Sequence, residues 1–104
     1  MTTIVVLFNL KPGVDEAVYQ KWARETDMPA AGRLPSVDRF DVLKAEGLLM
    51  SEATPPYAYV EIIDVNDMEQ FGKDVSTDVM QNVAAEFQSF ADNPMFILTS
   101  KLGA

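Results

Sequence analysis

The chain has 104 residues, of which 48% are hydrophobic and 23% charged, the size and composition of one globular domain. Its 16 acidic residues outnumber 8 basic ones, giving a formal net charge of −8, and such a surface repels nucleic acid and anionic membranes. Cysteine and histidine are both absent, which excludes disulfides, thiolate nucleophiles and every catalytic or metal site that needs imidazole or thiolate ligands.

Acid–base chemistry in this chain must therefore use carboxylates, tyrosine or lysine. A carboxylate that works near neutral pH needs its pKa raised by burial in a dry pocket. Residues 1–4 lack the basic segment of a signal peptide, and no apolar run approaches the ~20 residues of a membrane span. We therefore expect one cytoplasmic domain over residues 1–104, without a metal or cofactor.

The first predicted element is a strand over residues 2–10, which is apolar on both faces. Asp15 is a good N-cap for a helix that follows. Its apolar stripe has a spacing of four residues, Val14, Val18 and Trp22, with Tyr19 and Ala23 beside it. Pro29 disfavours helical geometry at the preceding residue, so we expect this helix to end near Thr26. A second short helical turn is expected from Pro29 through Arg33.

Two further strands are predicted over residues 37–45 and 57–63, joined by a loop over 46–56. The loop is long for a hairpin connection and carries an apolar centre, and long loops are often functional. Alternation along the third strand places Tyr57 and Tyr59 on the face opposite Ala58, Val60 and Ile62.

The last third of the sequence predicts a short helix, a longer helix and a final strand. Asn66, with Glu69 three residues on, resembles a capping box for the short helix, and Ser76 or Thr77 caps the longer one. The longer helix carries an apolar stripe, Val79, Val83, Phe87 and Phe90, flanked by Met80, Ala84 and Ala91. Asn93-Pro94 ends it, and the strand is expected over residues 95–102.

The order β-α-β-β-α-β predicts an α+β ferredoxin-like sandwich with a four-stranded antiparallel sheet. Right-handed crossovers place both helical regions on one face of this sheet. The first and last strands are apolar on both sides, so the other face forms an apolar patch that needs a partner. We therefore expect a homodimer with the two sheets packed face to face.

The segment from Trp22 to Pro35 resembles a motif of the dimeric α+β barrel superfamily. Many of its members have a helix tryptophan, then four residues, a histidine, one residue, a proline, and a Pro-Gly six residues later. This chain has Trp22, Asp27, Pro29 and Pro35 at those spacings, with aspartate at the histidine position and Pro35-Ser36 in place of Pro-Gly. Within the superfamily the chain resembles the RedY-like group, whose members are encoded with prodiginine and related pyrrole or indole antibiotic pathways.

The resemblance implies two four-stranded sheets that close a barrel, with a small-molecule pocket in each subunit between sheet and helices. Superfamily members include cofactor-free monooxygenases, isomerases, polyketide cyclases and accessory proteins, so the fold does not fix the reaction. The ligand that the resemblance implies is a small aromatic or pyrrolic molecule, and a larger pathway enzyme is a further candidate partner.

Asp27 is the candidate catalytic residue. Before Met-Pro it is also a good helix cap, and both roles are compatible. As the residue at the family's histidine position it would act as acid or base if apolar neighbours desolvate it. Arg24 or Arg33 at the surface is able to hold it ionised. Trp22 has the position of a core residue, although its flat ring also suits an aromatic ligand.

The remaining candidate ligand contacts are Asn9, Phe40, Met50 and Tyr59, with Arg24 and Trp22 from the motif. Asn9 either caps a loop or binds a ligand carbonyl. Tyr59 either packs in the dimer barrel, with its hydroxyl bonded across the interface, or supplies a pocket hydroxyl. Trp22, Phe40 and Met50 would wall the site against water.

Three functions remain open at this point. The first is an accessory enzyme of prodigiosin-type, bipyrrole biosynthesis that transfers a proton during cyclisation, dehydration or tautomerisation. The second is a non-catalytic protein of the same pathway that binds an intermediate or supports an enzyme, which the missing histidine favours. The third is a cofactor-free monooxygenase, in which the substrate itself activates oxygen.

Overall fold

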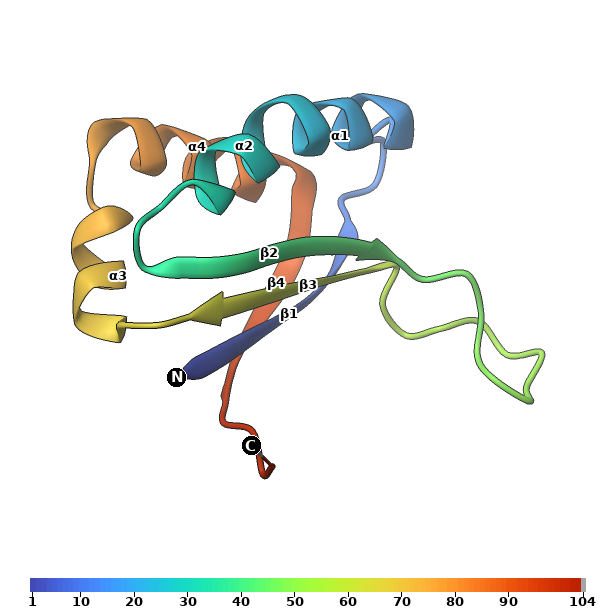
Figure 1. Cartoon of the computed structure of the whole chain (residues 1–104). Coiled ribbons are helices and arrows are strands. Elements are labelled where there is room, and N and C mark those ends of the chain that lie inside the picture. Colours follow the sequence, from blue (N-terminus) through green and yellow to red (C-terminus); the bar gives the residue numbers. More distant parts are fainter. Residues whose placement is uncertain (104) are drawn as a thin grey trace.

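The computed structural model describes residues 1–103, which form one antiparallel sheet covered on one side by helices (Figure 1). Along the chain the elements are β1 (Thr2–Leu10), α1 (Glu16–Trp22), a π-helical segment η1 (Ala23–Asp27), α2 (Met28–Gly32), β2 (Val37–Lys44), β3 (Tyr59–Val65), α3 (Met68–Asp74), α4 (Asp78–Phe90) and β4 (Ala91–Thr99).

The sheet has the strand order β2-β3-β1-β4, with every neighbouring pair antiparallel. Val6 in the central strand β1 is paired with Glu61 of β3 on one side and with Phe96 of β4 on the other. The predicted α+β ferredoxin-like fold with its four-stranded antiparallel sheet is therefore confirmed.

The core lies between the sheet and the helices. Alternate residues of β1, among them Val6 and Phe8, are fully buried there. The Phe8 ring stacks on Tyr59 with centroids 5.5 Å apart, and meets the edge of Phe87 from α4 at 5.0 Å. Each such aromatic contact contributes about 0.5–1.5 kcal/mol beyond the area it buries, so this cluster holds α4 against the sheet.

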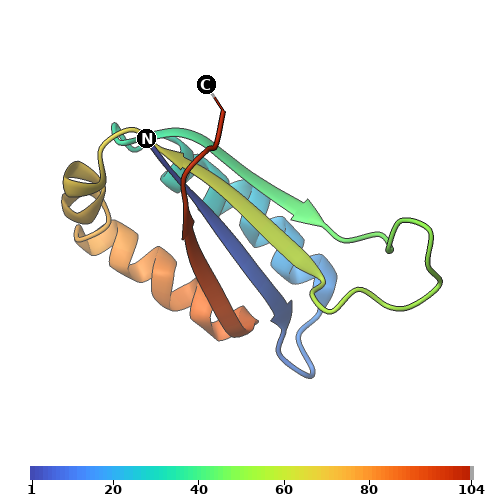
Figure 2. The same ribbon diagram turned by 90° about the horizontal axis from the view of Figure 1, so that it is seen from below.

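Within residues 1–103 no helix covers the other face of the sheet, as Figure 2 shows from below. Because alternate residues of each strand point there, this open face carries a continuous group of apolar side chains: Val5, Leu7, Leu43, Val60, Ile62, Met95 and Ile97. The second apolar face that the sequence predicted is therefore present.

The first helical region differs from the prediction. Asp15 does cap α1, accepting a hydrogen bond from the Ala17 amide at 2.9 Å. The helix does not end near Thr26, however, but continues through η1 into α2, with the Met28 amide bonded to the Ala23 carbonyl. Pro29 lies in the first turn of α2, directly after the π-helical segment. The wide π turn lets the helix pass the proline without a break.

In the first helical region and in α4, the buried side of the helix is rotated slightly from the predicted apolar stripe. In the first region Val18 is 55% exposed, and Tyr19 and Ala23 are buried in its place. In α4 the exposed residue is Val79, and Met80 is buried with Val83 and Phe87. A strict spacing of four residues drifts around a helix of 3.6 residues per turn, so the buried side follows the flanking positions.

Three boundaries in the second half are corrected. Asp67, not Asn66, caps α3, because its carboxylate accepts from the Glu69 and Gln70 amides. The strand β3 runs from Tyr59 to Val65, two residues later than predicted at both ends. Thr77 caps α4, as one of the two predicted alternatives.

The last strand begins at Ala91, directly after α4, and ends at Thr99, whereas residues 95–102 were predicted. The register to β1 shifts between Leu7 and Asn9, and Asn93 adopts a φ of 46°. This register shift is a β-bulge. Because β4 is an edge strand, the bulge accommodates Pro94 without removing a backbone hydrogen bond from the interior of the sheet.

The connection between β2 and β3 extends from the sheet as a long arm (Figure 1). Near its tip Leu49 is 94% exposed and Met50 97% exposed, and Met50 has a φ of 61°. Within residues 1–103, none of the helices combines the length and the apolar character that crossing a membrane requires.

Candidate functional site

A cavity of about 350 Å³ lies between the sheet and the helical layer. Most of its wall is apolar, and four phenylalanines from β2, α3, α4 and β4 contribute to it: Phe40, Phe71, Phe87 and Phe96. The charged groups in the lining are two carboxyls, Asp27 from η1 and Glu61 from β3, and no lysine or arginine of the described chain lines it. The cavity therefore combines an aromatic wall with two acidic groups.

Asp27 is the last residue of the π-helical segment and is only 6% exposed. Its side chain caps no helix, so the interpretation of this residue as an N-cap is wrong. The reason is that the helix continues through it, leaving no free first-turn amides for its carboxylate to accept. The side chain lines the cavity instead.

Burial raises the pKa of Asp27 from 3.8 to about 6, because the ionised carboxylate loses its hydration. Neither Arg24 nor Arg33 forms an ion pair with it in the described part of the chain. The arginines therefore do not hold the carboxylate ionised, and the apolar surroundings set its pKa.

Glu61 is a second buried carboxyl, which sequence reasoning missed. It lies on β3 between Tyr59 and Ile63, all three on the helix side of the sheet, and is only 4% exposed. Burial, and then the charge of Asp27, raise the pKa of Glu61 from 4.5 to about 8. The signal was available in the sequence, since Glu61 is the one charged residue in the alternating row of Tyr59, Ile63 and Val65.

Tyr19 of α1 adds a third polar group close to these carboxyls. Its side chain is fully buried. Within residues 1–103 neither its hydroxyl nor Oε2 of Glu61 has a hydrogen-bond partner. Burial raises the pKa of Tyr19, and the charges of Glu61 and Asp27 raise it further. Between about pH 6 and pH 8, Asp27 is therefore ionised, Glu61 is protonated and Tyr19 is neutral.

The structure separates the other predicted contact residues. Phe40 lines the cavity with Asp27. Trp22 does not line it, but packs on Phe90 with ring centroids 5.2 Å apart and donates from Nε1 to Glu86. Met50 lies in the exposed arm and is also not part of the wall.

Asn9 holds the end of the β2–β3 connection. Its amide nitrogen donates to the Pro56 carbonyl at 3.1 Å, and its amide oxygen accepts from the Ala58 backbone at 2.9 Å. Two roles were predicted for Asn9, and the structure shows it as the cap of this loop. Both polar atoms of the amide are used by the chain itself.

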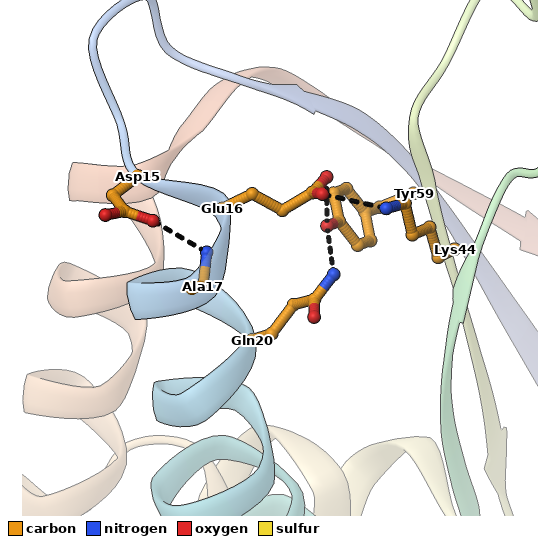
Figure 3. A network of polar contacts seen from close by, with 6 residues as sticks. All are labelled: Asp15, Glu16, Ala17, Gln20, Lys44 and Tyr59. Atoms are coloured by element: carbon orange, nitrogen blue, oxygen red, sulfur yellow. Dashed lines mark hydrogen bonds and ion pairs between the residues drawn. The ribbon is translucent and has the colours of Figure 1, made fainter.

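Tyr59 has its ring in the core and its hydroxyl in a polar network on the helix side (Figure 3). The hydroxyl donates to Glu16 at 2.8 Å and accepts from Gln20 at 3.0 Å, and Lys44 donates to the same carboxylate at 2.7 Å. The bonds from Lys44 and then Tyr59 lower the pKa of Glu16. The predicted orientation of this tyrosine into a dimer barrel is therefore wrong, because the register of β3 turns its side chain toward the helices.

The network borders a second hollow of about 270 Å³, between α1, η1 and β2. Tyr59 and Arg24 both line it, together with Lys44. The two predicted residues Arg24 and Tyr59 are thus close to each other but do not line the aromatic cavity that contains Asp27.

Comparison with known proteins gives a family and a set of similar folds. The family model described as "REDY-like protein HapK" matches residues 2–102. The structure of HapK from Hahella chejuensis is 28% identical in sequence, with a TM-score of 0.78 over 100% of this chain and 95% of that chain. A search of curated proteins found no match.

Two more distant structures share the fold. The cofactor-independent oxygenase SnoaB from Streptomyces nogalater is 16% identical, with a TM-score of 0.76 over 99% of this chain and 94% of that chain. A DABB family protein with a ferredoxin-like fold from Mesorhizobium loti is 14% identical, with a TM-score of 0.73 over 98% of this chain and 97% of that one.

Proposed function

Because the chain belongs to the REDY-like HapK family, we propose that it is an accessory enzyme of secondary-metabolite biosynthesis. In this proposal it acts in the cytoplasm on a small aromatic or pyrrolic intermediate of a prodigiosin-type pathway, in the assembly of its bipyrrole half. The reaction is a proton transfer that accompanies cyclisation, dehydration or tautomerisation, and Asp27 is the residue that moves the proton.

One observation carries the proposal: the carboxyl group of Asp27 lies buried in an aromatic cavity and, within residues 1–103, has no basic partner. An isolated carboxylate in such surroundings is costly, and chains keep one there mainly for a function. The pKa of Asp27, about 6, lets it accept a proton at neutral pH and return it readily. It also stands at the position where the superfamily motif has histidine, the usual proton-transferring residue near neutral pH.

The cavity supports the ligand class. Its volume of about 350 Å³ lies at the lower end of the range for small-molecule sites, which suits a compact ring system. Phenylalanine rings such as Phe40 and Phe87 offer stacking and edge contacts to a flat ligand. The absence of a basic residue from the described lining disfavours a phosphorylated or carboxylated ligand.

The test uses Asp27→Asn in the strain that encodes the chain, with culture extracts analysed by mass spectrometry. We expect the pathway product to fall and its precursor to accumulate, because asparagine has the same shape but cannot accept a proton. The matched control is Glu25→Gln, an exposed carboxyl of the same π-helical segment, which should leave the product unchanged. An unchanged product with Asp27→Asn would rule out a catalytic carboxylate at this position.

A second candidate function is a non-catalytic protein that binds an intermediate or supports a larger pathway enzyme. The observation that favours it is the arm between β2 and β3, where Leu48, Leu49 and Met50 are exposed together. Affinity capture from pathway-expressing cells tests this second function. A larger enzyme that is captured in stoichiometric amount with wild-type protein, and is lost when Leu49 and Met50 are both changed to serine, would support docking through the arm.

The third candidate function is a cofactor-free monooxygenase. Its test is oxygen uptake in the presence of a reactive phenol, which this function requires.

We also propose that the chain acts as a homodimer whose open sheet faces pack together. Apolar side chains of all four strands meet on this face, among them Leu7, Val60 and Ile97, and no other element of the described chain covers them. A second copy would bury them and leave the helix side, with its cavity, free for the ligand.

A further inference from the structure

Glu61 is a buried acid that the function proposed above leaves unused. We propose that Glu61 is a second catalytic residue, whose carboxylic acid gives a proton to a carbonyl oxygen or ring nitrogen of the ligand while the Asp27 carboxylate removes one from a neighbouring position. This inference rests on the proposed function, because it needs proton transfer at Asp27.

The position of Glu61 is that of a rigid, ligand-facing group. It lies on the interior strand β3, paired with Val6 of β1 and Val42 of β2, and its side chain lines the cavity. Among the described residues its Oε2 has no hydrogen-bond partner, although the side chain is only 4% exposed. A buried polar atom without a partner costs about 1–3 kcal/mol. A ligand that accepts or donates there would recover this cost.

Asp27 reaches the same cavity from the helical layer, so a ligand between the sheet and η1 meets one carboxyl from each side. Both groups stand on regular elements, a strand and a helix, and not on loops. Such placement fixes the two groups relative to the ligand, which bifunctional proton transfer requires.

The charges around Glu61 favour its acid form. The titratable groups that face it are Asp27 from η1 and Tyr19 from α1, both acidic. The neighbours on the adjacent strands are valines, and the polar cavity residues from α4 are the amides Gln81 and Gln88. With a pKa of about 8, against about 6 for Asp27, Glu61 holds its proton at neutral pH while Asp27 is ionised.

The ligand class follows from this pairing. It is an uncharged aromatic molecule with an acidic C–H or N–H close to a C=O or C=N group. The C–H or N–H bond breaks toward Asp27, its electron pair moves through the conjugated system, and an O–H or N–H bond forms with the proton of Glu61. Asp27 ends protonated and Glu61 ionised, and a water that enters on product release returns the proton from one to the other.

The probe for this chemistry is 2-tetralone, a neutral bicyclic ketone with acidic C–H bonds beside its carbonyl. In D₂O its conversion to the enol is followed by proton NMR as deuterium replaces these hydrogens, and its Kd is measured by shift titration. We expect wild-type protein to accelerate the exchange above buffer and Asp27→Asn to abolish the acceleration. Glu61→Gln should lower the bound rate about 100-fold, the usual size of a general-acid effect.

The binding of the ketone separates proton donation from a packing role. The glutamine amide still donates a hydrogen bond, so the Kd for Glu61→Gln should stay within about twofold of wild type while the rate falls. Glu25→Gln is the matched control and should change neither. The pH profile gives a further readout: the wild-type rate should peak between about pH 6 and pH 8, and the fall in rate at high pH should be lost in Glu61→Gln.

The outcomes that overturn the proposal are distinct. If Glu61→Gln exchanges as fast as wild type while Asp27→Asn is inactive, Glu61 is no proton donor and the proposed function still stands. If the ketone binds and its exchange rate with wild-type protein equals that in buffer, both the proposed role of Glu61 and the proposed function are wrong. If 2-tetralone does not bind in the cavity, the ligand class is wrong.

Discussion

The buried acid Glu61 makes the stability of the fold depend on pH in a way that one substitution should remove. Its pKa is about 8 in the folded chain and close to 4.5 when exposed. Between these values the folded chain binds more protons than the unfolded chain, so the free energy of unfolding falls as pH rises. The contribution of Glu61 to the free energy of unfolding is fully present below pH 4.5 and is lost as the pH rises through 8.

The size of this effect follows from the two pKa values. Each pH unit between them corresponds to about 1.4 kcal/mol, so the free energy of unfolding should fall by about 5 kcal/mol from pH 4.5 to pH 9 because of Glu61. This is a large part of the 5–15 kcal/mol that typically stabilises a domain. Glu61→Gln is neutral at every pH and should lose this part of the slope.

The assay is urea unfolding followed by fluorescence of Trp22, the single tryptophan, at several pH values and one fixed protein concentration. The curves of wild type and Glu61→Gln should diverge with rising pH, with the variant more stable by several kcal/mol at pH 9. Glu25→Gln, which changes an exposed carboxyl, should follow wild type. Parallel curves for wild type and Glu61→Gln would refute the view that Glu61 is buried without a compensating partner.

Two further predictions concern the polar network and the open sheet face. Tyr59→Phe removes the hydroxyl that joins Glu16 and Gln20, and should lower the free energy of unfolding in urea by about 1–2 kcal/mol. The control Tyr57→Phe should lower it by less than about 0.5 kcal/mol. Equal effects of the two substitutions would show that the network adds no stability. Leu7→Asp places a charge at the centre of the open face and should convert a dimer into a folded monomer in analytical ultracentrifugation. Val18→Asp on α1 is the matched control, and a wild-type monomer at all concentrations would contradict the dimer proposal.

Much of the fold could be predicted from local patterns. The order of strands and helices follows from apolar alternation, from the cap at Asp15 and from the glycine and proline breaks, and all of these act over a few residues. The boundaries that failed involve tertiary context. Pro29 was expected to end the first helix, but the helix continues past it through the π turn. Pro94 was expected to precede the last strand, but it lies within β4, where a bulge of this edge strand accommodates it.

The site could be predicted only in part. The motif around Asp27 identified one carboxyl, and Phe40 was placed correctly on the cavity wall. Met50 was assigned to the same wall from its apolar character, and Trp22 from its place in the motif and its flat ring. Neither argument tells an exposed loop methionine or a packed indole from a ligand contact. Glu61 was overlooked because an acidic residue within a strand usually faces water.

What the amino-acid sequence determined by itself is the chemistry that remains possible: without histidine or cysteine, proton transfer depends on carboxylates, tyrosine or lysine. It also determined the order of the elements, because hydrophobic periodicity is a local property. Only the tertiary structure decided that Asp27 and Glu61 share one cavity, since that depends on the register of β3 and on the helix continuing through η1. Burial, and with it the pKa of each acid, is a property of the packed chain and not of the residue.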